Sequence, residues 1–164
     1  MNLYEHYFEF LNPFQAFECQ KELDEGGWKF SARSNENDYT FFYMPLLDNK
    51  FFTGEFFEVI KQKIGKNYVI DRVHANGQTY GLCGSLHTDN TDDDCYTFLY
   101  YANPYWDVQW GGGTAFYSAM ESQHVPYIPN SAILFKSNIL HVGLEPTRHC
   151  RELRKTVSFQ LRRI

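Results

Sequence analysis

The sequence has few basic residues and no long apolar stretch. Its 15 Lys and Arg residues are outnumbered by 20 Asp and Glu residues, which gives a formal net charge of −5 at pH 7. This balance argues against a broad basic surface for nucleic acid. No stretch approaches the roughly 18 consecutive apolar residues of a membrane span, and the N-terminus lacks the apolar segment of a signal peptide. We therefore expect neither nucleic acid nor a membrane among the partners.

Cysteine is also scarce, and no two cysteines form a Cys-x-x-Cys pair. The four residues Cys19, Cys83, Cys95 and Cys150 permit three disulfide pairings. Without a Cys-x-x-Cys pair, little supports a zinc site that combines Cys83 and Cys95 with His87. We expect free thiols and a cytoplasmic location, because disulfides are rare in a reducing cytoplasm.

Aromatic residues are abundant, with 15 Phe, 12 Tyr and 3 Trp in a chain of 164 residues. A chain of this length is typical of one domain, and aromatic side chains are favoured in strands. Short strands are predicted at Tyr68–Val73, Tyr96–Tyr101, Ala115–Tyr117, Ala132–Phe135 and Lys155–Leu161, with Asn76-Gly77 as a turn. Many short strands separated by turns indicate a mainly β fold with supporting helices, of the jelly-roll type.

A helix is predicted near the N-terminus. Asn12-Pro13 is a typical helix start, with Asn as the N-cap and Pro at the first helical position. The helical segment Phe14–Leu23 follows, with Phe14, Phe17 and Leu23 as its apolar positions, which are expected to belong to the core. Gly26-Gly27 is expected to end it.

A second helix is predicted over Thr53–Ile64. Thr53 can cap its first turn, its phenylalanine and isoleucine residues form an apolar stripe, and Gly65 can end it. Such helices usually cover the outer face of a sheet, so we expect support structure here and no chemistry.

The chain contains His87-Thr88-Asp89 and, much later, His141. Side chains at positions i and i+2 of a strand face the same way, so His87 and Asp89 can reach one metal ion. Two histidines and one carboxylate form the ligand set of non-haem Fe(II) oxygenases. A lone His-x-Asp is common, and a lone histidine is more often only hydrogen-bonded. The metal interpretation therefore depends on the surrounding sequence.

Residues 68–164 resemble the prolyl 4-hydroxylase-like branch of the 2-oxoglutarate/Fe(II) oxygenases. The parts that carry the resemblance come in the family's order: His87–Asp89, the tyrosine-rich stretch 96–103, Trp106-Asp107, the Gly-Gly element at 110–114, the apolar stretch 129–135, His141-Val142 and an Arg before the final strand. The resemblance implies a double-stranded β-helix. It also implies one oxygenase domain, in which residues 1–66 are mainly helical support and residues 67–164 form the catalytic β core.

The same resemblance implies that His87, Asp89 and His141 bind Fe(II) as the catalytic centre. The co-substrate 2-oxoglutarate would chelate the iron through its 1-carboxylate and 2-keto oxygen, and O₂ would take an open position. Ascorbate would serve as a reductant. The far carboxylate of 2-oxoglutarate would pair with a buried arginine, whose planar fork makes two parallel hydrogen bonds.

Two arginines compete for this role. Arg151 fits the family spacing of roughly nine or ten residues after the distal histidine, and Arg154 lies further along. We favour Arg154 because strand periodicity places it on the polar face of the last strand. That face comprises Arg154, Thr156, Ser158 and Gln160, and the apolar face comprises Val157, Phe159 and Leu161.

Tyr101 resembles the family tyrosine whose hydroxyl helps to hold the far carboxylate. Tyr100 faces the opposite way on the same strand, so an error of one residue would exchange the two. Arg72, His74 and Asn103 lie where substrate or co-substrate contacts occur, although His74, beside the predicted turn, is expected to be exposed. Candidates for the rim of the pocket, unless they belong to the core, are Tyr80, Trp106, Trp110 and residues 92–94.

The resemblance implies a dioxygenase that uses 2-oxoglutarate and O₂ to hydroxylate a C–H bond, giving succinate and CO₂. The prolyl hydroxylase branch favours a prolyl residue of a peptide or protein as the substrate. Asp89 favours hydroxylation, because related halogenases have a small residue in place of this carboxylate. The sequence leaves the oligomeric state open.

Other interpretations remain open. The substrate could instead be a small molecule, a sugar or a nucleobase. A nucleic-acid demethylase is disfavoured, because the last strand lacks the Asn that this group carries two residues after its first arginine. The chain could also be a jelly-roll module that binds a metal or a sugar without catalysis. Binding of 2-oxoglutarate distinguishes these classes, since a sugar-binding module has no reason to bind it.

Overall fold

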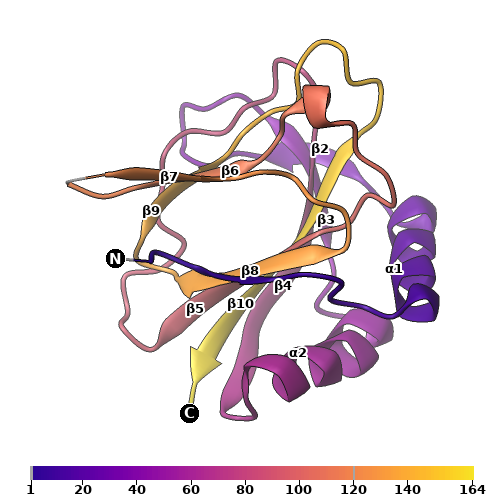
Figure 1. Ribbon diagram of the computed structural model, residues 1–164, viewed down its shortest axis with the longest axis vertical. Helices are drawn as coiled ribbons and strands as arrows, with labels where there is room; N and C mark the ends of the chain where they lie inside the picture. The colour runs from indigo at the N-terminus through magenta and orange to yellow at the C-terminus, as the bar shows by residue number, and fades with distance from the viewer. Residues whose placement is uncertain (1, 120) are drawn as a thin grey trace.

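The computed structural model describes residues 2–119 and 121–164, which form two antiparallel sheets and flanking helices. The large sheet has the order β1 (Glu5–Tyr7), β8 (Ser131–Lys136), β5 (Cys95–Tyr101), β10 (Arg154–Arg163), β4 (Tyr68–Gln78), β3 (Phe41–Pro45) and β2 (Lys29–Ala32). The small sheet has the order β7 (Ser122–Val125), β6 (Thr114–Tyr117) and β9 (Leu140–Gly143). Figure 1 shows the small sheet lying opposite part of the large one. The predicted mainly β jelly-roll fold is confirmed.

Alternate residues of β5 and β10 face two different layers. Phe98 and Phe159 pack on the side of the helices, and Leu99 and Tyr101 pack between the sheets together with Phe116 of β6. The apolar face of β10, Val157, Phe159 and Leu161, belongs to the layer beneath the helices. The polar face of β10, Arg154, Thr156, Ser158 and Gln160, lines a cavity between the sheets. The predicted facing of this strand is therefore confirmed.

Helix α1 (Pro13–Glu25) begins where the sequence predicts. The side chain of Asn12 accepts a hydrogen bond from the backbone N–H of Gln15 at 2.9 Å, and the side chain of Gln15 accepts one from the N–H of Asn12 at 3.2 Å. This reciprocal pair satisfies two backbone donors at the start of the helix. The predicted N-cap is therefore confirmed.

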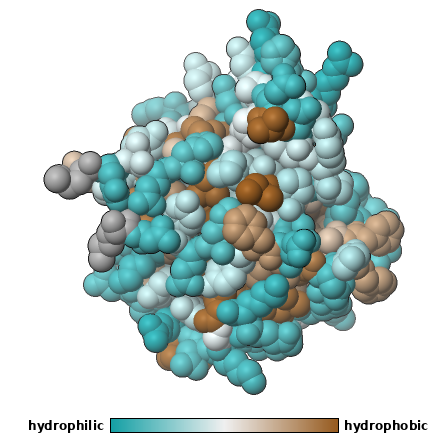
Figure 2. Space-filling view, viewed as in Figure 1, coloured by the Kyte–Doolittle hydropathy of each residue, from teal (hydrophilic) through white to brown (hydrophobic). Residues whose placement is uncertain are grey.

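Of the three predicted apolar positions of α1, only Leu23 belongs to its buried face. Phe14 and Phe17 are 67% and 65% exposed, whereas Cys19 and Leu23 are buried. Residues 19 and 23 are about one helical turn apart and lie on the opposite side of the helix from Phe14. Figure 2 shows apolar side chains at the right edge of the molecule, where Figure 1 places α1. The expectation that both phenylalanines are buried was wrong.

The second helical segment starts earlier than predicted. A π-helical segment, η1 (Phe51–Phe56), leads into α2 (Phe57–Ile64). The side chain of Asn49 accepts a backbone N–H of the first turn at 3.0 Å, so the predicted cap at Thr53 was wrong. Gly65 ends the helix as predicted, with a φ of 113° that favours glycine.

The predicted turn at Asn76-Gly77 is absent, because β4 continues through both residues. Gly77 pairs with Lys155 of β10 on one side and with Phe42 of β3 on the other. A Cβ atom on Gly77 would lie 3.0 Å from the Cβ of Phe42. Glycine here permits close packing of the strands and does not reverse the chain.

The first 66 residues contribute strands as well as helices. Strands β2 and β3 extend one edge of the large sheet, and β1 forms the other edge. All four cysteines are free thiols, as expected. In the part of the chain that the structure describes, no helix is long and apolar enough to cross a membrane.

Replacing Leu23 by Ala should lower the free energy of unfolding by about 2–5 kcal/mol, because it leaves a cavity beneath α1. Phe14→Ala, on the exposed side of the same helix, should change this free energy by less than about 0.5 kcal/mol. Urea unfolding followed by circular dichroism measures both. A loss for Phe14→Ala as large as that for Leu23→Ala would contradict this packing of α1.

Candidate functional site

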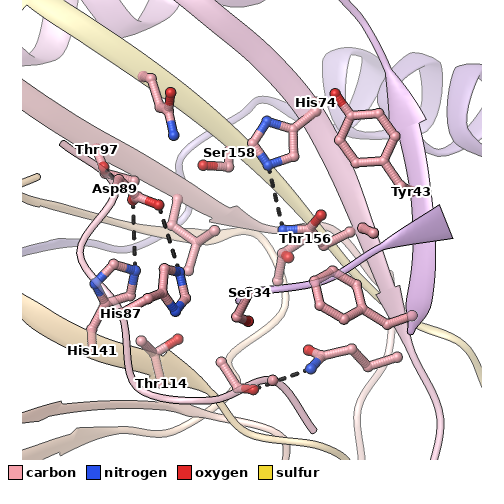
Figure 3. Close-up of a pocket in the computed structure, with 18 of the residues that line it drawn as sticks. Ser34, Tyr43, His74, His87, Asp89, Thr97, Thr114, His141, Thr156 and Ser158 are labelled. Carbon is pink, nitrogen blue, oxygen red and sulfur yellow. Dashed lines mark hydrogen bonds and ion pairs between the residues drawn. The ribbon is translucent and has the colours of Figure 1, made fainter. Parts of the chain in front are cut away.

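Three candidate metal ligands converge in the cavity between the sheets (Figure 3). His87 and Asp89 lie in the segment between β4 and β5, and His141 lies on β9. Asp89 Oδ1 is 3.6 Å from His87 Nε2, and Asp89 Oδ2 is 3.6 Å from His141 Nε2. One ligand atom from each residue lies within 4.8 Å of the others. The structure thus brings together the three residues that the sequence singled out.

A backbone bridge holds the two histidines side by side. The N–H of His87 donates to the carbonyl of His141 at 3.0 Å, and the N–H of His141 donates to the carbonyl of His87 at 2.9 Å. The N–H of Asp89 donates to the carbonyl of Ser137 at 2.9 Å. The His-x-Asp segment therefore lies beside β9 through one isolated bridge, outside any regular strand, and this pairing brings the two histidine side chains to one point.

Hydrogen bonds to the backbone orient both imidazole rings. His87 Nδ1 lies 2.9 Å from the carbonyl oxygen of Ser85, and His141 Nδ1 lies 2.9 Å from that of Ile139. A carbonyl oxygen only accepts, so each Nδ1 carries a proton. Both Nε2 atoms face Asp89. A neutral ring offers this nitrogen's lone pair to a metal ion, as in metal-ligating histidines, and a protonated ring donates from it to the carboxylate.

The three ligands have shifted pKa values. Burial opposes the charged form of Asp89, but the hydrogen bond with His87 and the neighbouring His141 and Thr97 outweigh it and lower the pKa to about 2. Burial also disfavours the charged form of His87, yet Asp89 outweighs it and raises that pKa. Burial lowers the pKa of His141. The site therefore holds a carboxylate at neutral pH, as a metal requires.

A threonine fixes the carboxylate. Thr97 Oγ1 donates to Asp89 Oδ2 at 2.6 Å and lies 2.9 Å from the hydroxyl of Ser137. Sequence analysis missed Thr97. Its position on β5, two residues before Leu99, places both side chains on the same face of the strand and could have indicated it.

Arg154 lies in the same cavity and is 1% exposed. Its Nη1 donates to Gln78 Oε1 at 2.7 Å, its Nη2 donates to the carbonyl of Gly113 at 3.3 Å, and its Nε donates to the carbonyl of Gly112. Burial lowers its pKa. No carboxylate among the described residues pairs with it, so a buried cation faces the cavity with neutral acceptors only. Such a cation fits a carboxylate ligand.

The structure distinguishes the two candidate arginines by their burial. Arg154 is buried and lines the cavity, whereas Arg151 is exposed and is not part of the lining. The cavity has a volume of about 250 Å³. Leu99 and Phe135 give it an apolar wall near the ligand cluster.

Tyr101 reaches the cavity only through another residue. It is fully buried, and its hydroxyl donates to Thr114 Oγ1 at 2.8 Å, while Thr114 itself lines the cavity. Burial raises the pKa of Tyr101 to about 12. Tyr100 faces the helices and donates to Asn130 at 3.0 Å. Sequence analysis missed Thr114, which stands between Tyr101 and the cavity.

The expectation that His74 is exposed was wrong. Its side chain is buried, because β4 continues through the predicted turn. It is 6% exposed and lines the cavity, and its ring stacks on Tyr43 with centroids 5.2 Å apart. Burial, together with the charge of Arg72, lowers its pKa to about 3. Asn103 is structural, because its side chain accepts from the N–H of Lys155 at 2.7 Å.

The predicted rim residues are elsewhere. Among the described residues, the lining of the cavity does not include Tyr80, Trp106, Trp110 or residues 92–94. Trp106 is core, stacked on Tyr127 at 4.3 Å. Within the described chain, the groups of candidate metal ligands do not include Cys83, so the zinc alternative gains no support.

The comparison with protein families identifies one match. The sequence model of the 2OG-Fe(II) oxygenase superfamily matches residues 72–160, which is more than half of the chain. The match spans all three candidate metal ligands and Arg154. No curated protein matches the chain.

Several solved structures share the fold. A prolyl-4-hydroxylase from Pseudomonas putida has a TM-score of 0.71 at 16% identity, over 99% of this chain and 94% of that chain. A prolyl hydroxylase from Trichoplax adhaerens, in complex with a hypoxia inducible factor peptide fragment, has a TM-score of 0.73 at 18% identity, over 99% and 84%. The non-haem α-ketoglutarate-dependent epimerase SnoN of nogalamycin biosynthesis has a TM-score of 0.70 at 13% identity, over 98% and 77%. At these identities the likeness shows the fold alone.

His74 should make the folded protein less stable as the pH falls. The folded protein keeps this ring neutral down to about pH 3, whereas the unfolded chain protonates it below about pH 6.5. The unfolded state binds more protons in this window, so stability is lost as the pH drops from 6.5. His74→Phe keeps the stack on Tyr43. It should reduce the loss in the free energy of unfolding by up to about 1.4 kcal/mol per pH unit.

Urea unfolding at pH 7 and pH 5 measures the effect. His149→Phe is the matched control, because His149 is exposed outside the cavity, and it should keep the wild-type dependence. If the free energy of unfolding changed equally between pH 7 and pH 5 in His74→Phe and in the wild type, His74 would not be a buried neutral histidine.

Proposed function

This chain belongs to the 2OG-Fe(II) oxygenase superfamily, and from this premise we propose that it is a hydroxylase whose iron is bound by His87, Asp89 and His141. Members of this superfamily are oxidoreductases that use Fe(II), 2-oxoglutarate and O₂. The proposal rests on one observation: a three-ligand cluster shares a cavity with a buried arginine that has no carboxylate partner among the described residues.

The residues present fit the implied groups. Two neutral imidazole nitrogens and one carboxylate suit Fe(II), and three protein ligands leave positions open for other molecules. We propose that Arg154 binds the far carboxylate of 2-oxoglutarate, because its guanidinium is buried and its acceptors within the described chain are all neutral. Thr114, which lines the cavity and accepts from Tyr101, is the hydroxyl best placed to assist.

When bound, Fe(II) and 2-oxoglutarate would supply the electrons that activate O₂: 2-oxoglutarate would lose CO₂ and take up one oxygen atom as succinate, and the other oxygen atom would enter a C–H bond of the substrate. The chain's own residues provide position. Ser85 and Ile139 fix the two imidazole rings through their carbonyl groups, and Thr97 fixes the Asp89 carboxylate. Leu99 and Phe135 keep the wall of the cavity apolar.

We propose a prolyl residue as the substrate, and ascorbate as a reductant that keeps the iron active. The support is the resemblance of this chain to the prolyl hydroxylase branch and the fold shared with two prolyl hydroxylases. We further propose that the whole chain is one oxygenase domain, in which residues 1–66 support the catalytic core of residues 67–164.

Anaerobic addition of Fe(II) and then 2-oxoglutarate to the metal-free protein should produce the visible charge-transfer band of the chelate. Asp89→Ala should abolish the band, because it removes the carboxylate ligand. Arg154→Ala should weaken the affinity for 2-oxoglutarate by roughly tenfold to a hundredfold, the cost of losing a charge-assisted pair. Absorbance spectroscopy measures both the band and the affinity.

Two variants make this titration decisive. Arg151→Ala removes an exposed arginine outside the cavity and should leave the affinity unchanged. Arg154→Lys keeps the charge without the fork and should fall between the wild type and Arg154→Ala. The proposed function would be overturned if the folded wild-type protein, freed of metal beforehand, gave no band after the addition of Fe(II) and 2-oxoglutarate.

Peptides that contain proline should gain one oxygen atom when they are incubated with the iron-loaded protein, 2-oxoglutarate and O₂. The added oxygen should be confined to proline, should require 2-oxoglutarate and should be lost with Asp89→Ala. Tandem mass spectrometry locates the modified residue. Oxygen on another residue type would reject the prolyl proposal while leaving the hydroxylase proposal intact.

A further inference from the structure

The charges of the cavity do not balance once the proposed cofactors are counted. Asp89 is the one carboxylate among the described residues that line the cavity, whereas Arg33, Arg72 and Arg154 are all part of the lining. The positive charges of Fe(II) and Arg154 together balance the negative charges of Asp89 and a 2-oxoglutarate dianion. Arg33 and Arg72 are then left without a counter-charge.

Arg72 has no carboxylate partner among the described residues. Its guanidinium lies 5.6 Å from the centre of the Tyr43 ring, and its Nη2 lies 3.4 Å from the Tyr43 hydroxyl. Arg162 of the same sheet behaves differently, because it pairs with Asp71 at 2.9 Å and with two further aspartates. Arg72 is an exposed residue of the cavity lining, so Tyr43 holds it in place while its charge stays available to a ligand at the cavity entrance.

Arg33 is also free of carboxylates in the described part of the chain. Its Nε donates to Thr40 Oγ1 at 3.1 Å, and its Nη1 donates to the carbonyl of Glu36 at 3.2 Å. It is exposed, on the segment after β2, and contributes to the cavity lining. The entrance of the cavity therefore carries positive charge from two separate elements.

His74 supplies a buried hydrogen-bonding atom without a partner. The amide nitrogen of Asn76 lies 3.5 Å from His74 Nε2, and an amide nitrogen only donates, so Nε2 accepts and Nδ1 carries the proton of the neutral ring. His74 Nδ1 is buried and has no partner among the described residues. An unpaired buried donor is costly unless a ligand satisfies it.

The neighbours of His74 are polar on both strands. In the pairing of β4 with β10, His74 stands opposite Ser158, Asn76 opposite Thr156, and Arg72 opposite Gln160. All six side chains line the cavity. Figure 3 shows the His74 ring between Ser158 and Tyr43, on the opposite side of the cavity from Thr114. This wall presents hydrogen-bonding groups to a substrate and offers no apolar groove.

We infer that the primary substrate carries a carboxylate close to the carbon that is oxidised, and that Arg72 and the Nδ1–H of His74 bind it. Arg33 at the entrance attracts the same group. The inference rests on the proposed function and specifies its substrate class. A free amino acid such as proline, or a proline at the C-terminus of a peptide, has such a carboxylate, whereas a proline inside a peptide does not.

The test uses the full chain labelled with ¹⁵N-histidine, loaded with Zn(II) as a diamagnetic substitute for iron and saturated with 2-oxoglutarate. Acetate is the charged probe and acetamide is its neutral match, both at constant ionic strength. Acetate should shift the His74 Nδ1 resonance saturably, and acetamide should not. The spectrum of His74→Phe identifies the resonance. Equal shifts with acetamide, or no shift with acetate, would overturn the inference.

Two variants separate specific binding from general charge. Arg72→Gln should weaken the affinity for acetate by about tenfold, as expected for a charge-assisted hydrogen bond, while Arg151→Gln should leave it unchanged. Equal affinities of these two variants would also overturn the inference. Zn(II) and 2-oxoglutarate must first shift the resonances of His87 and His141. If they do not, the proposed function fails, whatever acetate does.

A second pair of probes distinguishes the sources of the carboxylate. Free L-proline is compared with L-prolinamide, and a peptide that ends in proline is compared with its C-terminal amide. Binding of only the free amino acid indicates a small-molecule substrate, and binding of the acidic peptide indicates a chain terminus. Amides that bind as well as their acids would overturn the inference.

Discussion

The site depends most on the hydrogen bonds that hold the buried guanidinium of Arg154. A full positive charge in the interior needs acceptors on every side, and here they come from Gln78 of β4 and from the carbonyl groups of Gly112 and Gly113. A Cβ atom on Gly112, whose φ is 75°, would lie 3.2 Å from Arg154 Cδ. The glycine turn before β6 is therefore shaped by the arginine, and this turn joins the small sheet to the end of the large one.

What the sequence predicted well follows from the period of two in strands. The alternation along β10 put its polar side chains on one face, and the structure keeps this arrangement. His87 and Asp89 also meet at one point, although their segment is joined to β9 by an isolated bridge and is not a strand. The choice between Tyr100 and Tyr101 follows the same rule, because only Tyr101 faces the space between the sheets. Local geometry predicted the facing of these side chains, whereas the choice of Tyr101 and of the metal ligands came from the resemblance to the family.

The features that escaped prediction depend on partners far away in the sequence. Asn76-Gly77 is a turn signal by itself, yet pairing with β3 and β10 makes it a central strand and buries His74 with it. Phe14, Phe17 and Leu23 were the predicted apolar positions of α1, but the helix packs through Leu23 and leaves both phenylalanines exposed on its other side. Apolar spacing shows that a helix has faces and does not show which one the rest of the protein covers.

The backbone bridge between His87 and His141 joins two segments that are distant in the chain, and the proposed ligands lie on both sides of it. A metal ion held by both histidines would therefore act as a cross-link between the segment before β5 and the small sheet. Ligand binding that occurs only in the folded state stabilises that state by mass action. Bound iron would then add to the folding stability of the protein as well as to its chemistry, because it would reinforce a junction that otherwise depends on the two backbone hydrogen bonds between His87 and His141.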